Sequence, residues 1–142
     1  MVDEDIAVDK LRHINEYTDD LKQMRGLPRA EYLDDMVLQR AVERTLTTLI
    51  EACIDLAQHI RSTEALSPSG TARQEIQALG NAGIISEETQ AKMEEGVGFR
   101  NVLVHRYGEI DHDVVYDVLH DDLQWFEKFQ QELARWFQEQ TQ

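Results

Sequence analysis

The residues best suited to chemistry lie in one short segment, Gly98-Phe-Arg-Asn-Val-Leu-Val-His-Arg-Tyr107. The imidazole of His105 can accept or donate a proton. The guanidinium of Arg100 presents a fixed fork of N–H donors that fits a phosphate group. Such a pair can cleave RNA without a metal ion: the histidine removes the proton from a ribose 2′-hydroxyl, and the arginine stabilises charge on the phosphoryl oxygens. Asn101 would donate a hydrogen bond to the phosphate or orient His105.

The spacing within this segment separates two pairs of side chains. Arg100 and Tyr107 are seven residues apart, which is about two helical turns, so they would share one face of a helix. Arg100 and His105 are five residues apart, or about 140° around a regular helix. They would meet only if the helix loosens or if a second subunit brings its own residues into the same cleft. Spacing alone favours plainer interpretations, namely a structural Arg–His pair and a helix-end tyrosine at the edge of the core.

Five amphipathic helices are predicted to position this segment, at about 5–24, 31–61, 71–79, 87–107 and from 111 to beyond 136. The second is indicated most strongly, because residues 31–61 contain no Gly or Pro and their apolar side chains recur at spacings of three and four. These side chains are Leu38, Val42, Leu46, Leu49, Cys53, Leu56 and Ile60. Ser67-Pro-Ser-Gly70 is expected to end this helix and form a loop. The pattern predicts an all-α fold, an antiparallel bundle of about five helices in a single domain spanning residues 1–142.

The fourth predicted helix is apolar on two sides. Met93, Val97 and Val104 cluster on one side, and Phe99, Val102 and Leu103 lie on another. One side would face the core of the same chain, which leaves the other for a second copy. We therefore expect a homodimer with this helix near the interface.

The composition limits where such a protein works. The 142 residues include 28 acidic and 14 basic side chains, for a net charge of -14. No apolar run approaches the length of about 20 residues that a membrane span requires. The acidic N-terminal residues also lack the basic segment followed by an apolar segment that is typical of a signal peptide. We expect a cytoplasmic protein that does not bind membranes. A strongly acidic, lysine-poor surface also suits a high-salt cytoplasm, and an ordinary acidic protein is the alternative interpretation.

The acidic charge also bears on partners, because an acidic protein repels nucleic acid at long range. Any RNA site must therefore be a local basic patch. Arg40, Arg44 and Arg106 are candidates to extend a phosphate-binding surface around the segment, and ion pairs with the many acids are their alternative role.

One group of residues on the second predicted helix resembles a metal site. Glu51, Asp55 and His59 recur at steps of four, but a solvated flank or hydrogen bonds between helices are the favoured interpretation. We expect no metal ion and no cofactor bound by this chain.

The motifs resemble those of a known family. Arg40-Ala-Val-Glu-Arg-Thr-Leu46, Ile50-Glu-Ala-Cys-Ile-Asp-Leu-Ala-Gln-His-Ile60 and Gly98-Phe-Arg-Asn-Val-Leu-Val-His-Arg-Tyr-Gly-Glu-Ile-Asp111 are similar to segments of the HepT toxins of the HEPN superfamily. The family signature is an arginine, four residues, a histidine, any residue and a tyrosine, present here as Arg100, His105 and Tyr107. The resemblance covers the chain from the second to the fifth predicted helix. It implies a dimeric, all-helical ribonuclease whose Arg100 and His105 form the cleavage site at the dimer cleft.

The resemblance also implies a partner and a means of control. HepT-like toxins pair with a small nucleotidyltransferase, the MntA antitoxin, which uses ATP to transfer AMP to the motif tyrosine, here Tyr107. The added phosphate would pair with Arg100 and occupy the space that the RNA phosphate needs. The alternative is a non-catalytic helical module that assists a nucleotidyltransferase. In that case Arg100 and His105 would bind a nucleotide or the partner.

Overall fold

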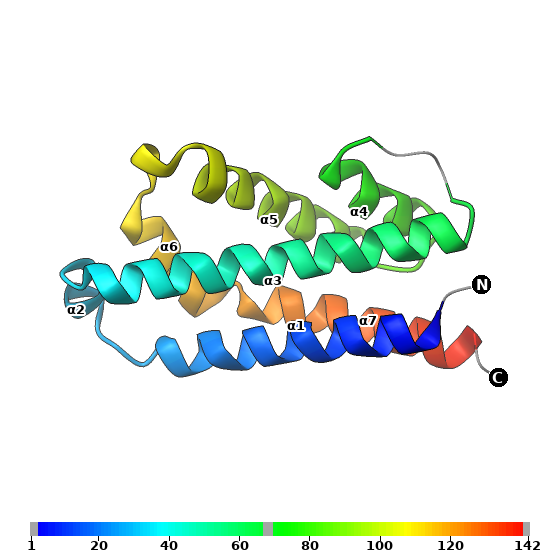
Figure 1. The fold of residues 1–142 in the computed structure, drawn as a ribbon, viewed down its shortest axis with the longest axis horizontal. Coiled ribbons are helices and arrows are strands. Elements are labelled where there is room, and N and C mark those ends of the chain that lie inside the picture. The colour runs from blue at the N-terminus through cyan, green and yellow to red at the C-terminus, as the bar shows by residue number, and fades with distance from the viewer. Residues whose placement is uncertain (1–2, 67–69, 141–142) are drawn as a thin grey trace.

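The computed structural model of the chain describes residues 3–66 and 70–140. These residues form seven α-helices and one 3₁₀ turn, with no β-strand among them (Figure 1). The elements are α1 (Glu4–Met24), α2 (Arg29–Leu33), α3 (Met36–Thr63), α4 (Ala72–Asn81), α5 (Glu87–His105), η1 (Tyr107–Glu109), α6 (His112–Asp121) and α7 (Leu123–Gln140). The prediction of an all-helical fold is confirmed.

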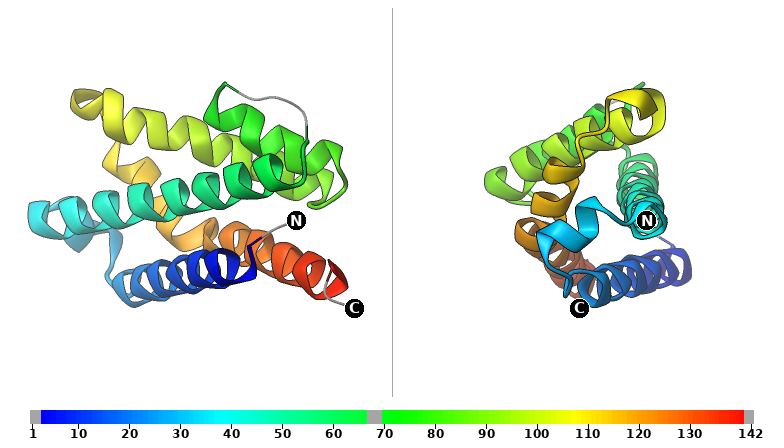
Figure 2. Two further views of the ribbon diagram at one scale, coloured as in Figure 1. Left: turned by 45° about the vertical axis from the view of Figure 1, so that its right-hand side comes forward. Right: turned by 90° about the vertical axis from the view of Figure 1, so that its left-hand side faces the viewer.

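The long helices lie side by side around α3. Helix α3 packs on α1 and on α5, and α7 packs on both α1 and α5. Helix α1 begins and α7 ends at one end of the bundle, whereas α2 and η1 lie at the other end (Figures 1 and 2). No helix among the described residues is long and apolar enough to cross a membrane.

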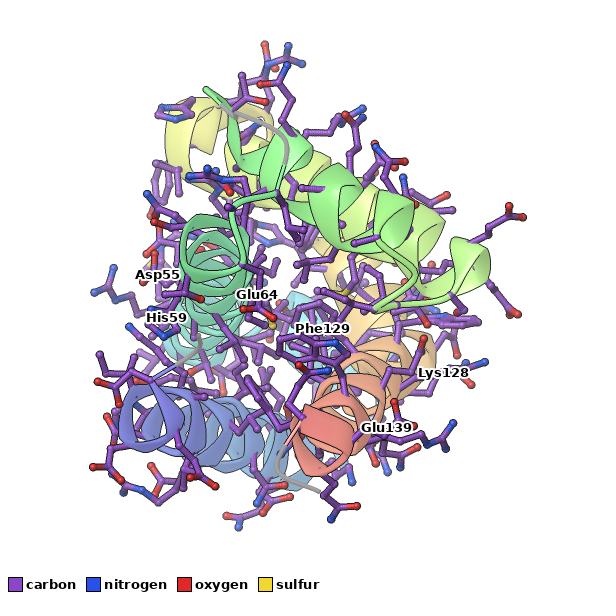
Figure 3. All side chains as sticks on the ribbon, turned by 90° about the vertical axis from the view of Figure 1, so that its right-hand side faces the viewer. Asp55, His59, Glu64, Lys128, Phe129 and Glu139 are labelled. Carbon is purple, nitrogen blue, oxygen red and sulfur yellow. The ribbon has the colours of Figure 1, made fainter. Side chains whose placement is uncertain are left out.

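The core follows the apolar stripe predicted for α3. Leu46, Leu49, Cys53 and Leu56 are completely buried, and each large aliphatic side chain of this kind contributes roughly 1.5–3 kcal/mol by leaving water. Helix α7 adds Phe129, which points into the bundle, while Lys128 and Glu139 of the same helix point outward (Figure 3). Each long helix therefore presents one apolar face to a shared interior.

The helix predicted for residues 31–61 is two helices, α2 and α3. The side chain of Asp35 accepts a hydrogen bond from the backbone N–H of Leu38 at 3.0 Å and so caps a new helix start. The side-chain amide of Gln39 donates to the carbonyl oxygens of Tyr32 and Leu33 at 3.0 and 3.1 Å, which closes the corner. The prediction of one continuous helix is wrong here because an aspartate cap ends and restarts helices without Gly or Pro.

The helix predicted from residue 111 onward is also two helices, α6 and α7, which meet at Asp122. The break lets the two halves pack on different neighbours. Helix α6 contacts α2, where Arg29 pairs with Asp113 at 3.0 Å and with Asp117 at 2.6 Å. Helix α7 instead packs along α1.

The remaining three predicted helices match α1, α4 and α5. Thr71 caps α4, and Ser86 caps α5 by accepting a hydrogen bond from the N–H of Thr89 at 3.2 Å. Residues 67–69 of the predicted loop lie outside the described residues.

The two apolar sides predicted for α5 are mostly covered by the chain itself. Met93, Val97 and Leu103 are buried, and Phe99 packs partly buried against the same core. Val104, which we grouped with Met93 and Val97, is instead 43% exposed, because the C-terminal half of α5 extends beyond α4 (Figure 1). The apolar surface that α5 leaves open for a second copy is therefore limited to its last turn.

Candidate functional site

The candidate segment forms the last two turns of α5 and the turn that follows. Helix α5 is regular through His105, since the N–H of Arg106 still bonds to the carbonyl oxygen of Val102 at 3.0 Å. Arg106 then leaves the helical conformation with φ -122° and ψ 45°, and η1 begins at Tyr107. Tyr107 thus lies beyond the helix, so the prediction that Arg100 and Tyr107 share one helix face is wrong.

Arg100 is half-buried and faces α3. It lines a shallow groove of about 240 Å³ with Glu51, Ile54 and Asp55, which we call the Arg100 groove. The Nε of Arg100 is buried and has no hydrogen-bond partner among the described residues. An unpaired buried donor costs about 1–3 kcal/mol, so an acceptor that reaches the groove, such as a phosphate oxygen, would satisfy it.

His105 is exposed at the end of α5. Because the helix is regular between residues 100 and 105, the two side chains leave it about 140° apart. A single chain therefore places Arg100 in a groove against α3 and His105 on another face. The helix does not loosen to bring them together, which leaves a second subunit as the route that we anticipated.

The face of α5 that carries His105 also carries Asn101 and Gly98, at spacings of three and four. Asn101 is exposed. A Cβ atom placed on Gly98 would lie 3.3 Å from Nη2 of Arg73, a residue of α4. The missing side chain at position 98 therefore gives the Arg73 guanidinium room to lie against this face.

Tyr107 lies in a second groove, beside the first half of α3. This Tyr107 groove has a volume of about 400 Å³ and is lined by Arg40, Glu43, Arg44, Thr47, Leu103, Val104 and Tyr107. The guanidinium carbon of Arg40 lies 4.7 Å from the centre of the Tyr107 ring, within the range of a cation–π contact. Tyr107 remains 54% exposed, so a partner protein can approach it.

A buried carboxylate holds Arg40 in this groove. Glu43 is only 5% exposed, and both of its oxygens accept hydrogen bonds from Nη1 of Arg40, at 3.1 and 3.3 Å. One of these oxygens also lies 3.5 Å from Nδ1 of His112, the first residue of α6. Burial raises the pKa of the Tyr32 hydroxyl, and the nearby Glu43 carboxylate raises it further.

The structure separates the arginines that we had grouped as phosphate candidates. Arg40 and Arg44 line the Tyr107 groove, whereas Arg106 is exposed and lines neither groove. Sequence reasoning missed Glu43 and Arg73. A charged residue inside the apolar stripe of α3 is a detectable signal for Glu43, but nothing in the sequence indicated that Arg73 lies against Gly98.

Two of the three residues that resembled a metal site instead join α3 to the start of α1. His59 Nε2 accepts a hydrogen bond from the N–H of Asp3 at 3.3 Å, and Asp55 pairs with Lys10 at 3.8 Å. Both side chains project from the same flank of α3 (Figure 3). The favoured interpretation, contacts between helices, is confirmed for these two residues.

Comparison with known proteins defines the class. The family model described as "Ribonuclease HepT-like" matches residues 14–133, and the chain belongs to this family. The match covers α2 to α6 entirely, about half of α1 and the first part of α7, so it includes both grooves and the whole candidate segment.

The chain is also similar to individual members. It is 30% identical over 125 residues to the "mRNA nuclease HepT" of Shewanella oneidensis, covering 88% of this chain and 93% of that protein. It is 31% identical over 117 residues to the "tRNA nuclease HepT" of Aphanizomenon flos-aquae, covering 82% and 80%. Among solved structures, the tri-AMPylated Shewanella oneidensis HEPN toxin in complex with MNT antitoxin superposes with a TM-score of 0.87 at 28% identity, covering 94% of this chain and 99% of that one.

Proposed function

We propose that this protein is the toxin of a toxin–antitoxin pair, a metal-independent endoribonuclease that is neutralised when a nucleotidyltransferase antitoxin adenylylates Tyr107. One observation carries the proposal: a chain of the ribonuclease HepT-like family has Arg100 and His105 in the last two turns of α5 and Tyr107 in the turn that follows. The relatives named as mRNA and tRNA nucleases support RNA as the substrate. An RNA substrate and an ATP-using partner would also support a location in the cytoplasm.

Cleavage follows from the two side chains. His105 removes the proton from a ribose 2′-hydroxyl, and the freed oxygen attacks the adjacent phosphorus. The bond from phosphorus to the 5′-oxygen breaks, leaving a 2′,3′-cyclic phosphate and a 5′-hydroxyl that takes up a proton. Arg100 stabilises the charge on the phosphoryl oxygens, and an RNA phosphate would satisfy its unpaired Nε. No metal ion or cofactor bound to this chain is needed.

The arrangement of these groups favours a homodimer. Arg100 and His105 leave a regular helix in different directions, so a second protomer would complete each cleavage site. The exposed end of α5 that carries His105 would lie near this interface, with the Tyr107 groove outside it. Asn101, Arg73 and Arg106 would guide the RNA backbone toward it.

Control acts through Tyr107. The phenol oxygen attacks the α-phosphorus of ATP held by the partner, the bond to the β-phosphate oxygen breaks, pyrophosphate leaves, and the phenol proton passes to solvent. The exposure of Tyr107 gives the partner access. The similar solved complex, a tri-AMPylated HEPN toxin with its MNT antitoxin, supports this form of regulation. ATP is a substrate of the partner rather than a ligand of this chain.

The decisive experiment expresses the chain alone and measures growth and RNA integrity. We expect growth arrest with RNA breakdown, and loss of both in His105→Ala and Arg100→Ala, with purified proteins slower by about 10²- to 10⁴-fold. Arg135→Ala, an exposed arginine on α7, is the matched control and should remain toxic. Cleavage should persist in EDTA. Full activity in both site variants would refute the mechanism, and absence of any RNA cleavage would favour the non-catalytic module.

A companion experiment tests the control. Tyr107→Phe should stay toxic when the antitoxin is present, because it lacks the oxygen that accepts AMP. Intact mass of the wild-type protein co-expressed with the antitoxin should show added AMP. Neutralisation of Tyr107→Phe by the antitoxin would instead point to inhibition by binding.

A further inference from the structure

We propose that the Tyr107 groove is the binding site for the AMP attached to Tyr107, with Arg40 and Arg44 binding the phosphate and Glu43 positioning Arg40. This inference rests on the proposed adenylylation and adds where the nucleotide goes. It also replaces the expectation that the phosphate pairs with Arg100.

The groove places two arginines near the ring whose oxygen would be modified. The guanidinium of Arg40 lies 4.7 Å from the centre of the Tyr107 ring, and Arg44, one turn further along α3, lines the same groove. A phosphate bonded to the phenol oxygen would remain attached to this ring and within reach of the Arg40 fork. Arginine binds phosphate through paired N–H donors, so this is the chemistry that an adenylyl phosphate needs.

The shape and polarity of the groove also suit the rest of the nucleotide. Its volume of about 400 Å³ is bordered by the apolar side chains of Leu103 and Val104. Val104 is 43% exposed, which leaves an apolar surface uncovered beside Tyr107. Base and sugar can lie on this surface while the phosphate meets the arginines.

Glu43 fixes the position of Arg40 before any nucleotide arrives. Its buried carboxylate accepts two hydrogen bonds from Nη1 of Arg40. These bonds leave the N–H donors of Nη2 to bind a phosphate. His112 lies 3.5 Å from the same carboxylate and ties this contact to the start of α6. An arginine already held in one orientation loses less side-chain entropy on binding phosphate.

The Arg100 groove is a poorer site for this phosphate. Tyr107 lies beyond the end of α5 and does not line this groove, so a phosphate attached to its phenol oxygen is less able to reach Arg100 than a free RNA phosphate is. In the Tyr107 groove, two arginines face the single carboxylate of Glu43. The charges therefore direct the attached phosphate toward Arg40 and Arg44. AMP bound there would prevent Arg40 and Arg44 from binding the phosphates of RNA.

The test uses the adenylylated protein made by co-expression with the antitoxin, with AMP content measured by intact mass. A phosphodiesterase that cleaves tyrosyl-AMP bonds is then added, and the rate of AMP release is measured per modified chain. We expect release to be at least about tenfold faster from Arg40→Gln, Arg44→Gln and Glu43→Gln than from wild type, because docking shields the bond. Arg135→Gln should match wild type.

Two further measurements separate positioning from general damage. High salt, about 1 M NaCl, should speed release from the wild-type protein without any substitution, because it screens the arginine–phosphate contact. If Glu43 acts through Arg40, Glu43→Gln should add little to the release rate of the Arg40→Gln variant. An independent effect would show that Glu43 does not act by positioning Arg40.

The outcomes distinguish this site from the modification itself. If intact mass shows AMP on wild type but all proteins release it equally fast and salt has no effect, the docking site is wrong while adenylylation stands. If no AMP is ever found on the chain, both the modification and this site are overturned.

Discussion

At the residue scale, Gly98 controls how closely Arg73 approaches the face of α5 that carries His105. A helix interior normally gains about 0.5–1 kcal/mol when Gly is replaced by Ala. At position 98, the new Cβ would lie 3.3 Å from Nη2 of Arg73, and this exposed side chain would have to move. We therefore predict that Gly98→Ala raises Tm but slows RNA cleavage several-fold.

Gly96→Ala is the matched control, since a Cβ on Gly96 meets no atom within 4 Å. It should raise Tm similarly and leave cleavage unchanged. Arg73→Gln should slow cleavage as Gly98→Ala does, without the gain in Tm. Equal cleavage by wild type, Gly98→Ala and Arg73→Gln would show that Arg73 has no part in RNA binding.

The site residues that sequence reasoning could name are those with a distinctive type or spacing. Arg100, His105 and Tyr107 belong to one local motif and could be found without a fold. Glu43 and Arg73 act through contacts with distant segments, Glu43 with α6 and Arg73 with α5. No local pattern specifies which helices meet, so these contacts, and the separation of Arg100 from Tyr107, required the structure.

At the element scale, Asp122 lies at the break between α6 and α7, and we predict that Asp122→Asn raises stability at neutral pH. Burial raises the pKa of this carboxyl, with Lys92 opposing and Asp121, Glu95 and Asp117 raising it further. Because the pKa of Asp122 is higher in the folded state than the unfolded value of about 3.9, its protonated form favours folding. This contribution to stability is complete only below about pH 3.9. This contribution is lost as pH rises through the folded pKa.

The measurement is Tm from pH 3 to 7 for wild type and Asp122→Asn. The variant should have the higher Tm at pH 7, and the difference should vanish as pH falls toward 3, where the wild-type carboxyl is protonated. Asp121→Asn, at an exposed neighbouring position, should change Tm less. A constant difference across the range would show that the ionisation of Asp122 is not the cause.

Helix existence could be predicted from the sequence, but two helix boundaries could not. The apolar stripe at spacings of three and four specifies α3 because that face must be buried. The breaks at Asp35 and Asp122 contain no Gly or Pro, and the periodicity continues across them. At the first break the Asp35 cap starts a new helix, and the breaks let α2 and α6 pack against each other, an arrangement that depends on the whole topology.

At the scale of the molecule, a net charge of -14 on 142 residues makes the folded chain repel itself. Charge repulsion acts over about 30 Å at 0.01 M salt and about 3 Å at 1 M. We predict that Tm rises steadily with KCl over this range, because screening relieves the repulsion in the compact state. Loss of helical circular dichroism at low salt would support adaptation to a salty cytoplasm, whereas full stability there would exclude it.

At the same scale, we predict that the cleavage site is complete only in an oligomer. Arg100 and His105 leave α5 in different directions within one chain, so we predict a homodimer in which each site combines Arg100 of one protomer with His105 of the other. Arg100→Ala and His105→Ala should each form inactive dimers. A dimer that contains one chain of each kind has one site with both residues intact and one with neither.

Mixing the two inactive variants therefore tests the shared site. If protomers exchange at random, half of the dimers are mixed and each has one of two sites restored, so about one quarter of wild-type activity should return. Co-expression with two different affinity tags isolates the mixed dimer, which should have about half the activity. If Arg100 and His105 of the same chain act together, no activity returns, because every site then lacks one of the two residues.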